Sequence, residues 1–317
     1  MNLPLLAFFL LEIKFRQLLV IGLVVGSLYA LVAIGFVLIY KASKVVNFAQ
    51  GEAVMFGGFV AVILVTQYRL PLAIAFPLTL LVGALLGFII ERVILRPLIG
   101  KPLVAVVMAT IGLGAVFRGL APTLWSPQTK AFPQVSIGFV HPFSTSTVNI
   151  FSTPIAQLDL WSLALAVLFI VALSAFFRYT RTGIAMQAVA DDQEAAQSMG
   201  ISVRRVYAIT WAAALVVAAV GGIMWGNRQG VDLNLAGVGL KVFPAVILGG
   251  LESLTGAIVG GVIIGMAETF TGGYLNPWLQ DAGIGGGFDA VVPFLLLVGI
   301  LMVRPHGIFG REQIERV

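Results

Sequence analysis

Residues 18–40, LLVIGLVVGSLYALVAIGFVLIY, form an apolar stretch without a single charged side chain. A helix needs about 20 consecutive apolar residues to cross the hydrocarbon core of a bilayer, and this stretch is long enough. Comparable stretches recur along the chain, at 46–66, 72–91, 103–121, 158–177 and 206–226. The repetition predicts a bundle of membrane-spanning helices.

The composition of the 317 residues leads to the same prediction. The chain is 59% hydrophobic and only 10% charged, whereas a soluble domain carries about 25% charged residues. So few charges cannot cover a water-facing surface. We therefore expect an all-α polytopic membrane protein, a single transmembrane domain over 1–317 in a lipid bilayer. The net charge of +5 fits basic residues at the cytoplasmic interface. The sequence contains no basic patch interleaved with aromatic residues, so we do not expect nucleic-acid binding.

The last third of the chain is less regular. The apolar segment 239–250 is too short to cross a membrane. The segment 254–270 can cross it, and so can 288–303, although that segment is a little short. We therefore expect about eight transmembrane helices, including a hairpin over 239–270 whose first arm is broken or re-entrant. The opening residues, MNLPLLAFFLLEIKFRQ, lack the basic start of a signal peptide and predict a short interfacial segment.

Small residues at four-residue spacing predict where these helices approach one another. Lipid is as apolar as a leucine side chain, so helices associate in it by close packing, and glycine permits the closest approach. Four such pairs occur: Gly22 and Gly26, Gly83 and Gly87, Gly256 and Gly260, Gly261 and Gly265. Together they predict a compact bundle.

The positive-inside rule gives the bundle an orientation. With 178–205 in the cytoplasm, twelve of the 19 basic residues lie on that side: Lys41, Lys44, Arg92, Arg96, Lys101, Arg178, Arg181, Arg204, Arg205, Arg304, Arg311 and Arg316. The C-terminus is then cytoplasmic. The polar excursion 122–157 is extracytoplasmic, and its composition suits short strands or an extended cap.

Familiar catalytic motifs are absent from the sequence. It contains no G-x-x-x-x-G-K-[ST] phosphate loop, no H-E-x-x-H helix and no G-x-S-x-G elbow. Its two histidines, His141 and His306, are too few and too far apart for a metal site, and without cysteine there is no disulfide or thiolate ligand. We expect no catalytic residue, no metal and no cofactor in this chain.

Polar side chains at membrane depth are costly and usually functional, and they mark two places. Asn47 and Gln50 at the start of the second span could form a capping box, and Glu52 suits the positive end of that helix; a well-capped helix start is the simpler interpretation. Interrupted segments in two halves of a transporter often form its translocation site. We therefore expect a pathway lined by Asn47, Gln50, Glu52, Lys241 and Pro244.

Two further charges near helix ends have simpler interpretations. Arg118 is expected to extend its guanidinium to the interface. Glu268 is expected to pair with a neighbour or to lie at the outer mouth.

The polar segment 181–205, RTGIAMQAVADDQEAAQSMGISVRR, predicts one exposed helix that Gly200 ends in a left-handed cap. Its small residues Ala195 and Ala196 would let a partner surface approach closely. The carboxylates Asp191, Asp192 and Glu194 would solvate the helix or pair with basic groups of that partner.

Within this segment, Glu-Ala-Ala followed after three residues by Gly, at 194–200, resembles the EAA loop of ABC-importer permeases. Four blocks in order resemble the permeases of the branched-chain amino-acid family: GSLYALVAIGFVLIYKASKVVNFAQGE (26–52), RTGIAMQAVADDQEAAQSMGI (181–201), GLKVFPAVILGGLESLTGAIVGG (239–261) and VRPHGIFG (303–310). The blocks extend over nearly the whole chain, so the resemblance does not rest on the loop alone.

The resemblance implies an inner-membrane permease subunit of a bacterial ABC importer for branched-chain or other neutral, hydrophobic amino acids. It implies that a coupling helix docks into a cytoplasmic ATP-binding subunit, which holds the ATP and Mg, through Asp191, Asp192, Glu194, Ala195, Ala196 and Gly200. It also implies a second permease chain, usually a different one, and an extracytoplasmic substrate-binding protein that carries most of the selectivity.

Three alternatives remain at this stage. A permease for urea or short amides shares much of the pattern. A secondary transporter or channel would need no ATPase, which the EAA pattern disfavours. A membrane enzyme is disfavoured by the missing motifs.

Overall fold

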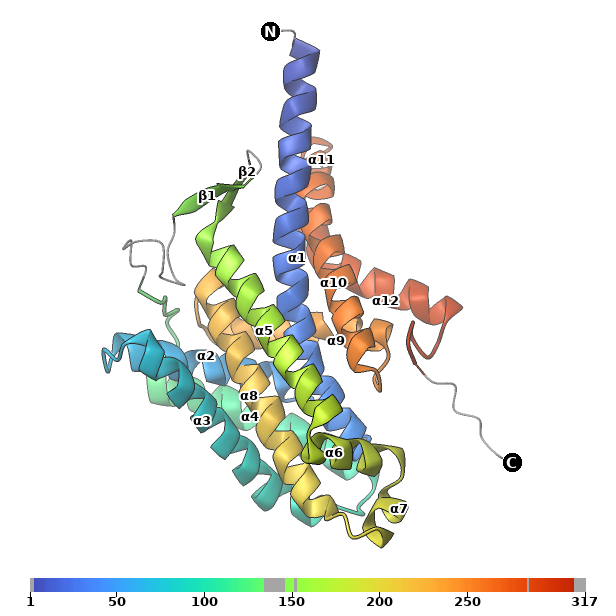
Figure 1. Cartoon of the computed structure of the whole chain (residues 1–317). Helices are drawn as coiled ribbons and strands as arrows, with labels where there is room; N and C mark the ends of the chain where they lie inside the picture. The colour runs from blue at the N-terminus through green and yellow to red at the C-terminus, as the bar shows by residue number, and fades with distance from the viewer. Residues whose placement is uncertain (1–2, 134–145, 151–152, 284, 311–317) are drawn as a thin grey trace.

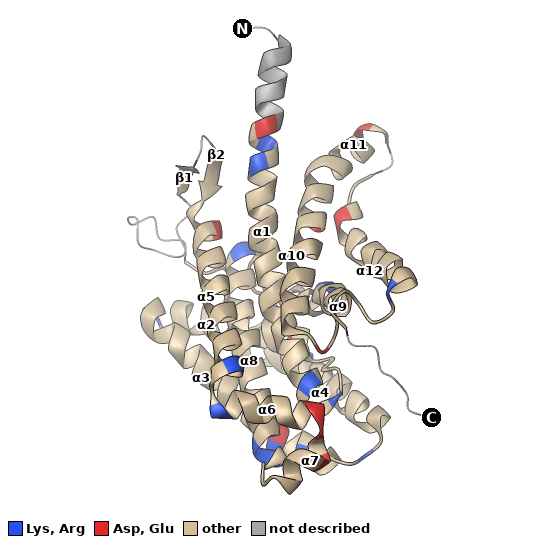
Figure 2. Cartoon of the chain, turned by 45° about the vertical axis from the view of Figure 1, so that its right-hand side comes forward, with Lys and Arg blue, Asp and Glu red and all other residues tan. Residues whose placement is uncertain are grey.

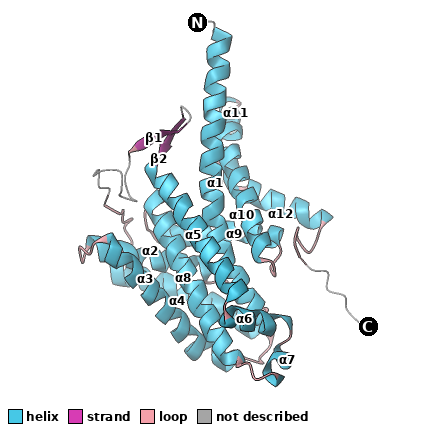
Figure 3. Cartoon of the chain, viewed as in Figure 1, coloured by secondary structure: helices cyan, strands magenta, loops and turns pink. Residues whose placement is uncertain are grey.

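Helices joined by short turns make up most of the computed structural model, which describes residues 3–133, 146–150, 153–283 and 285–310 (Figures 1 and 3). The α-helices are α1 (Leu3–Ser43), α2 (Gln50–Thr66), α3 (Leu72–Ile90), α4 (Leu103–Trp125), α5 (Gln157–Tyr179), α6 (Arg181–Asp191), α7 (Gln193–Ser198), α8 (Val203–Gln229), α9 (Gly237–Gly249), α10 (Leu254–Phe270), α11 (Asn276–Asp281) and α12 (Val292–Val303). Short π or 3-10 segments are η1 (Glu91–Leu95), η2 (Arg96–Leu98), η3 (Leu233–Ala236), η4 (Thr271–Leu275) and η5 (Phe288–Ala290).

Among the described residues, six helical segments are long and apolar enough to cross a membrane: Glu12–Ser43, Leu72–Leu98, Leu103–Trp125, Gln157–Tyr179, Val203–Gln229 and Leu254–Asp281. Shorter apolar helices cover Gln50–Thr66, Leu233–Gly249 and Phe288–Val303. This confirms an all-helical chain with many potential spans. The number of about eight transmembrane helices stays a prediction.

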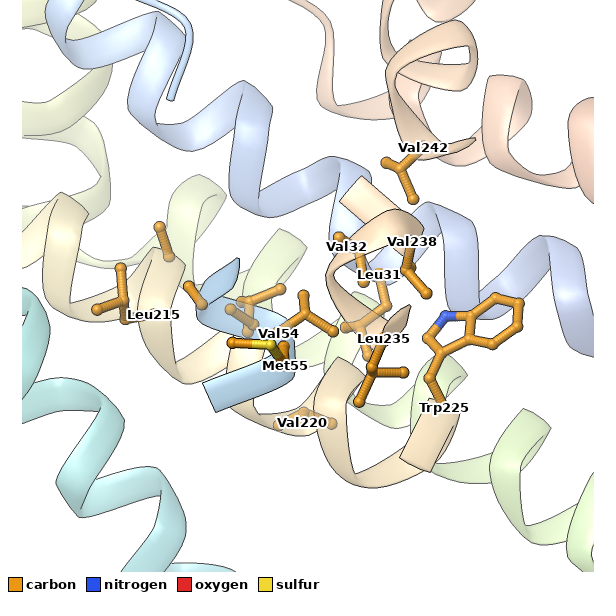
Figure 4. Close-up of a cluster of buried hydrophobic side chains, with 14 of the residues drawn as sticks. Leu31, Val32, Val54, Met55, Leu215, Val220, Trp225, Leu235, Val238 and Val242 are labelled. Atoms are coloured by element: carbon orange, nitrogen blue, oxygen red, sulfur yellow. The ribbon is translucent and has the colours of Figure 1, made fainter. Parts of the chain in front are cut away.

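Two helices, α1 and α8, form the centre of the bundle. In the most apolar window of each, 72% of the residues are buried, whereas the other four long segments bury only 17–33%. Leu31 and Val32 of α1 and Leu215 and Val220 of α8 belong to one buried cluster, which α2, η3 and α9 complete (Figure 4). The remaining long helices surround this centre and turn leucine, valine and phenylalanine outward, as a lipid environment allows.

Close backbone contacts hold the central helices together, and all four glycine pairs take part. A methyl group on Gly265 of α10 would lie 2.3 Å from the Gly26 Cα of α1, and one on Gly87 of α3 would lie 2.5 Å from the Trp211 carbonyl oxygen of α8. Gly260 and Gly256 of α10 face the α9 backbone equally closely, in an antiparallel α9–α10 hairpin. The packing predicted from these glycines is therefore confirmed.

The N-terminal segment differs from its prediction. Instead of a separate interfacial piece, the residues from Leu3 onward continue α1 to Ser43. At about 1.5 Å per residue this helix is about 60 Å long, twice the thickness of a hydrocarbon core, and its N-terminal end extends beyond the other helices (Figure 1). Glu12 and Arg16, one helical turn apart, form an ion pair that favours helix where the sequence suggested an interruption.

The excursion 122–157 contains a small hairpin. Strands β1 (Thr147–Ile150) and β2 (Thr153–Ala156) pair antiparallel, with Thr147 opposite Ala156, as the expectation of short strands had it. Residues 134–145, including His141, lie outside the described residues, as do Arg311 and Arg316 of the charge count.

A pair of alanine substitutions tests the glycine packing. Gly265→Ala should cost about 1–3 kcal/mol of stability, because its methyl group overlaps the α1 backbone. Gly112→Ala is the matched control, since that helical glycine has open space around its Cα. Thermal unfolding of the detergent-purified chain should show a lower Tm for the first variant only; equal Tm values would contradict the close contact.

Candidate coupling segment and interior contact

The polar segment folds as two helices, which corrects the prediction of one. Asp192 has extended backbone angles, φ −151° and ψ 110°, between α6 and α7. Its carboxylate accepts a hydrogen bond from the Ala195 amide at 2.9 Å, so Asp192 caps α7. Thr180 caps α6 in the same way, through the Gly183 amide at 3.0 Å. Asp192 therefore has a local structural task that the sequence pattern did not assign to it.

Helix α7 ends as predicted, at Gly200. The Gly200 amide donates to the Gln197 carbonyl at 2.9 Å, and the Ile201 amide donates to the Ala196 carbonyl at 3.0 Å. This pair of bonds, with φ +84° at Gly200, is a Schellman cap, which glycine forms without strain. Both ends of this short helix are thus fixed.

The inner face of α7 is occupied by its own chain. Ala196 is buried in a small apolar cluster with Met186 and Val189 of α6 and with Val203 and Val206 of α8. The expectation that Ala196 offers a surface to a partner is therefore wrong. Asp191, Glu194, Ala195 and Gly200 are exposed, and Met199 is 84% exposed, so these residues form the accessible face.

Beside α7 lies a cavity of about 470 Å³ that the sequence did not predict. Gln193, Glu194 and Gln197 line it from α7, and Lys101 lines it from the turn before α4. Tyr207 and Trp211 of α8 form part of its wall. Lysine and arginine residues gather at this end of the bundle, around α6 and α7 (Figure 2).

The two interrupted segments meet in the interior. Gly51, in the first turn of α2, packs so closely on α9 that a methyl group there would lie 2.9 Å from the Gly239 Cα. Asn47 and Gln50 are 1% and 0% exposed. The structure thus brings 47–52 and 239–252 together, but it buries Asn47 and Gln50 in protein rather than exposing them to an open route.

The polar groups of this contact are paired differently from a capping box. The Asn47 side chain accepts from the Ala49 amide at 3.0 Å and donates to the Gln50 side chain at 3.1 Å. The Gln50 amide group in turn donates to the Ala214 carbonyl of α8 at 3.4 Å. The start of α2 is therefore tied to α8. The Gln50 side chain bonds to the Asn47 side chain and to α8, and does not cap the Asn47 backbone amide as a capping box requires.

The charged residues near these segments form ion pairs. Glu52 accepts a hydrogen bond from Arg118 of α4 at 2.8 Å. The Arg118 side chain is 55% exposed, so its extension to the membrane interface stays a prediction. Glu252, after α9, pairs with Lys44 at 2.6 Å. Pro244 is buried inside α9.

A cluster of three polar side chains, Tyr29, Lys241 and Glu268, joins helices α1, α9 and α10. Lys241 pairs with Glu268 at 2.6 Å, and Glu268 also accepts a hydrogen bond from the Tyr29 hydroxyl. Glu268 thus pairs with neighbours, as one of the two expectations had it. Tyr29 was missed, because a tyrosine in an apolar span gives no signal until its partner, 239 residues away, is known.

Comparisons with known proteins cover nearly the whole of this fold. Residues 18–302 match the family described as "Branched-chain amino acid transport system / permease component". The chain is 32% identical to the high-affinity branched-chain amino acid transport system permease protein LivH of Escherichia coli (strain K12), over 96% of this chain and 98% of the relative. The corresponding BraD protein of Pseudomonas aeruginosa is also 32% identical, with the same coverage. The fructose import permease protein FruG of Bifidobacterium longum is 26% identical, over 81% of this chain and 76% of that protein.

Proposed function

The chain belongs to the family of permease components of branched-chain amino acid transport systems, and from this premise we propose that it carries branched-chain or other neutral, hydrophobic amino acids through the membrane. It is a multi-pass transport subunit and not a catalytic one. The energy source in this proposal is a separate ATP-binding subunit that holds ATP and Mg.

One observation carries the choice of substrate: the similarity to the two amino acid permeases covers 96% of the chain. A match of this extent includes the helices that surround any route, and not only the coupling segment. The similarity to FruG is lower and shorter, which favours amino acids over sugars.

The accessible face of α7 is the proposed contact with the ATP-binding subunit. Asp191, at the end of α6, and Glu194 of α7 supply negative charge. Ala195 permits close approach, and Met199, just after α7, offers an adaptable apolar side chain. The two caps keep this face rigid, and the Ala196 cluster joins it to the first turns of α8. Those features support α7 as the element that transmits movement.

We place the α6–α7 end in the cytoplasm and β1–β2 on the opposite side of a bacterial inner membrane. The gathering of basic side chains around α6 and α7 supports this orientation (Figure 2). A second permease chain beside this one and an extracytoplasmic substrate-binding protein complete the proposed importer. The C-terminus lies on the cytoplasmic side in this arrangement.

The interior contact is the proposed closed part of the route. Backbone at membrane depth can be irregular only inside protein or beside water, and both 47–52 and the η3–α9 region are of this kind. In this proposal Asn47, Gln50 and Glu52 face the route when Gly51 and Gly239 separate, with Lys241 and Pro244 on the other side. The tight Gly51–Gly239 contact supports a closed state.

Uptake by the complete importer tests the substrate proposal. Proteoliposomes with this chain, its partner permease, the ATP-binding subunits and enclosed ATP should accumulate labelled leucine, isoleucine or valine when the binding protein is outside. Urea and fructose should not accumulate. Transport of urea or fructose in place of the amino acids would contradict the proposal, as would leucine uptake without ATP.

Two variants of α7 test coupling in the same assay. Glu194→Lys reverses an exposed charge, and Gly200→Val places a β-branched side chain at φ +84°. Each should lower leucine uptake at least tenfold while the complex remains in the membrane. Gln187→Lys on α6 is the charge control, because this exposed side chain lies off α7. Unchanged uptake by both α7 variants would rule out the coupling role.

The orientation is testable with single cysteines, since the native chain has none. Ser198→Cys at the end of α7 should react with a membrane-impermeant maleimide only when the cytoplasmic face is accessible. Ser146→Cys, before β1, should react only from the other face. Reaction of both from one face would invalidate the proposed topology.

A further inference from the structure

A second cavity, of about 290 Å³, lies where α8 gives way to η3 and α9. Trp225 and Gln229 line it from the last turns of α8, Asp232 and Asn234 from the start of η3, and Val238 and Lys241 from α9. Twenty-two residues of α8 separate Trp225 from Val203, where α7 packs, a distance of about 33 Å along a helix. The cavity is therefore far from the coupling segment.

The wall of this cavity carries one positive and one negative group. Lys241 is 38% exposed, while its partner Glu268 is only 12% exposed, so the pair holds the ammonium at the cavity and keeps the carboxylate inside. An ammonium has three donors, and Glu268 takes one of them at 2.6 Å. The Tyr29 hydroxyl holds Glu268 from the other side, which fixes the position of this charge.

Asp232 is the negative group. Its oxygens accept from the Asn234 backbone amide at 2.9 Å, the Thr129 hydroxyl at 3.2 Å and the Asn234 side chain at 3.3 Å. All donors that the described part of the chain offers Asp232 are neutral, so its charge has no cation in contact among those residues. A carboxylate accepts up to about four hydrogen bonds and can still take one from an ammonium group.

Between these charges the wall is apolar. The Trp225 ring packs on Tyr29, with centroids 5.1 Å apart, and Val238 lies beside it (Figure 4). The Trp225 indole N–H is buried and has no hydrogen-bond acceptor in the described part of the chain, which is uncommon for a buried indole. The wall thus combines a cation, an anion, an apolar surface and an unused donor.

We propose that this cavity is a transient binding subsite for a zwitterionic α-amino acid. The Lys241 ammonium takes the carboxylate, Asp232 takes the α-ammonium, and the aliphatic side chain lies against Trp225 and Val238. This inference rests on the proposed function, which it makes more specific. The cavity, at about 290 Å³, is at the lower end of small-molecule pockets, which run from about 300 Å³. This volume suits one small solute.

The pair of opposite charges also selects against other solutes. An acid without an ammonium group leaves Asp232 without a cation and is repelled by it, and an amine without a carboxylate is repelled by Lys241. A neutral sugar or amide uses neither charge. Binding is weak because the solute carboxylate and Glu268 compete for the same Lys241 ammonium. Weak binding suits a site on a transport route, which must release its solute.

Equilibrium binding to the importer without its binding protein tests the subsite. The complex in nanodiscs is titrated with tritiated leucine, and leucinamide and 4-methylpentanoate compete as the amine-only and acid-only probes. Leucine should bind at least tenfold more tightly than either probe, because each lacks one charged hydrogen bond.

Two substitutions assign the charges. Asp232→Asn keeps the cap of η3, since asparagine caps as well as aspartate, and should weaken leucine about tenfold without weakening 4-methylpentanoate. Lys241→Met should weaken leucine and 4-methylpentanoate but not leucinamide, and Lys241→Arg should restore leucine binding, which separates the site from any loss of fold. Lys44→Met is the matched control, because Lys44 forms the same 2.6 Å pair, with Glu252, away from the cavity.

The outcomes separate this inference from the function on which it rests. Leucine uptake by the wild-type importer measures the proposed function independently of the binding titration. An importer that takes up leucine but binds none without its binding protein, or whose Asp232→Asn variant binds leucine as the wild type does, overturns the subsite and leaves the function intact. An importer that takes up no amino acid overturns both.

Discussion

The close approach of helix backbones around α1 and α8 is the constraint on which the rest of this structure depends. Lipid offers helices no hydrophobic reason to associate, so many small dispersion contacts at short range must hold them. At Gly26 and Gly265 the α1 and α10 backbones come so near that a single methyl group would overlap. Because α1 is central and mostly buried, the position of α10, and through it of α9, follows from this contact.

This constraint also explains which parts of the fold could be predicted. Helix existence follows from apolar length, and each glycine pair marks an interface because only a residue without Cβ fits there. The side-chain pairs between distant helices could not be predicted, since Glu52 and Arg118 are 66 residues apart and Tyr29 and Glu268 are 239 apart. Local spacing also misled: the Asn47–Gln50 interval suits a capping box, but a contact with α8 engages the Gln50 amide group instead.

The blocks that resemble the permease family are distant in sequence but adjacent in the structure. The last block lies along the end of α9, where the Ile308 amide donates to the Leu248 carbonyl at 2.8 Å and the Phe309 amide to the Gly249 carbonyl at 3.2 Å. The first block meets the same helix at Gly51 and Gly239. Helix α9 is thus held at both ends, at its first turn by the start of α2 and at its last turn by the C-terminal segment.

Packing connects this contact to α7. Ala196 of α7 packs with Val203 and Val206 in the first turn of α8, and further along α8 the Ala214 carbonyl holds Gln50. A shift of α7 along the bundle therefore cannot leave the start of α2 unchanged unless α8 bends, and a helix that is mostly buried in a dense interior resists bending. Such interiors move between discrete arrangements rather than deforming continuously. The contact between α2 and α9 is formed by two glycines, which have no side chain to follow a moving neighbour. In the proposed coupling, a shift of α8 that carries α2 away would therefore open this contact.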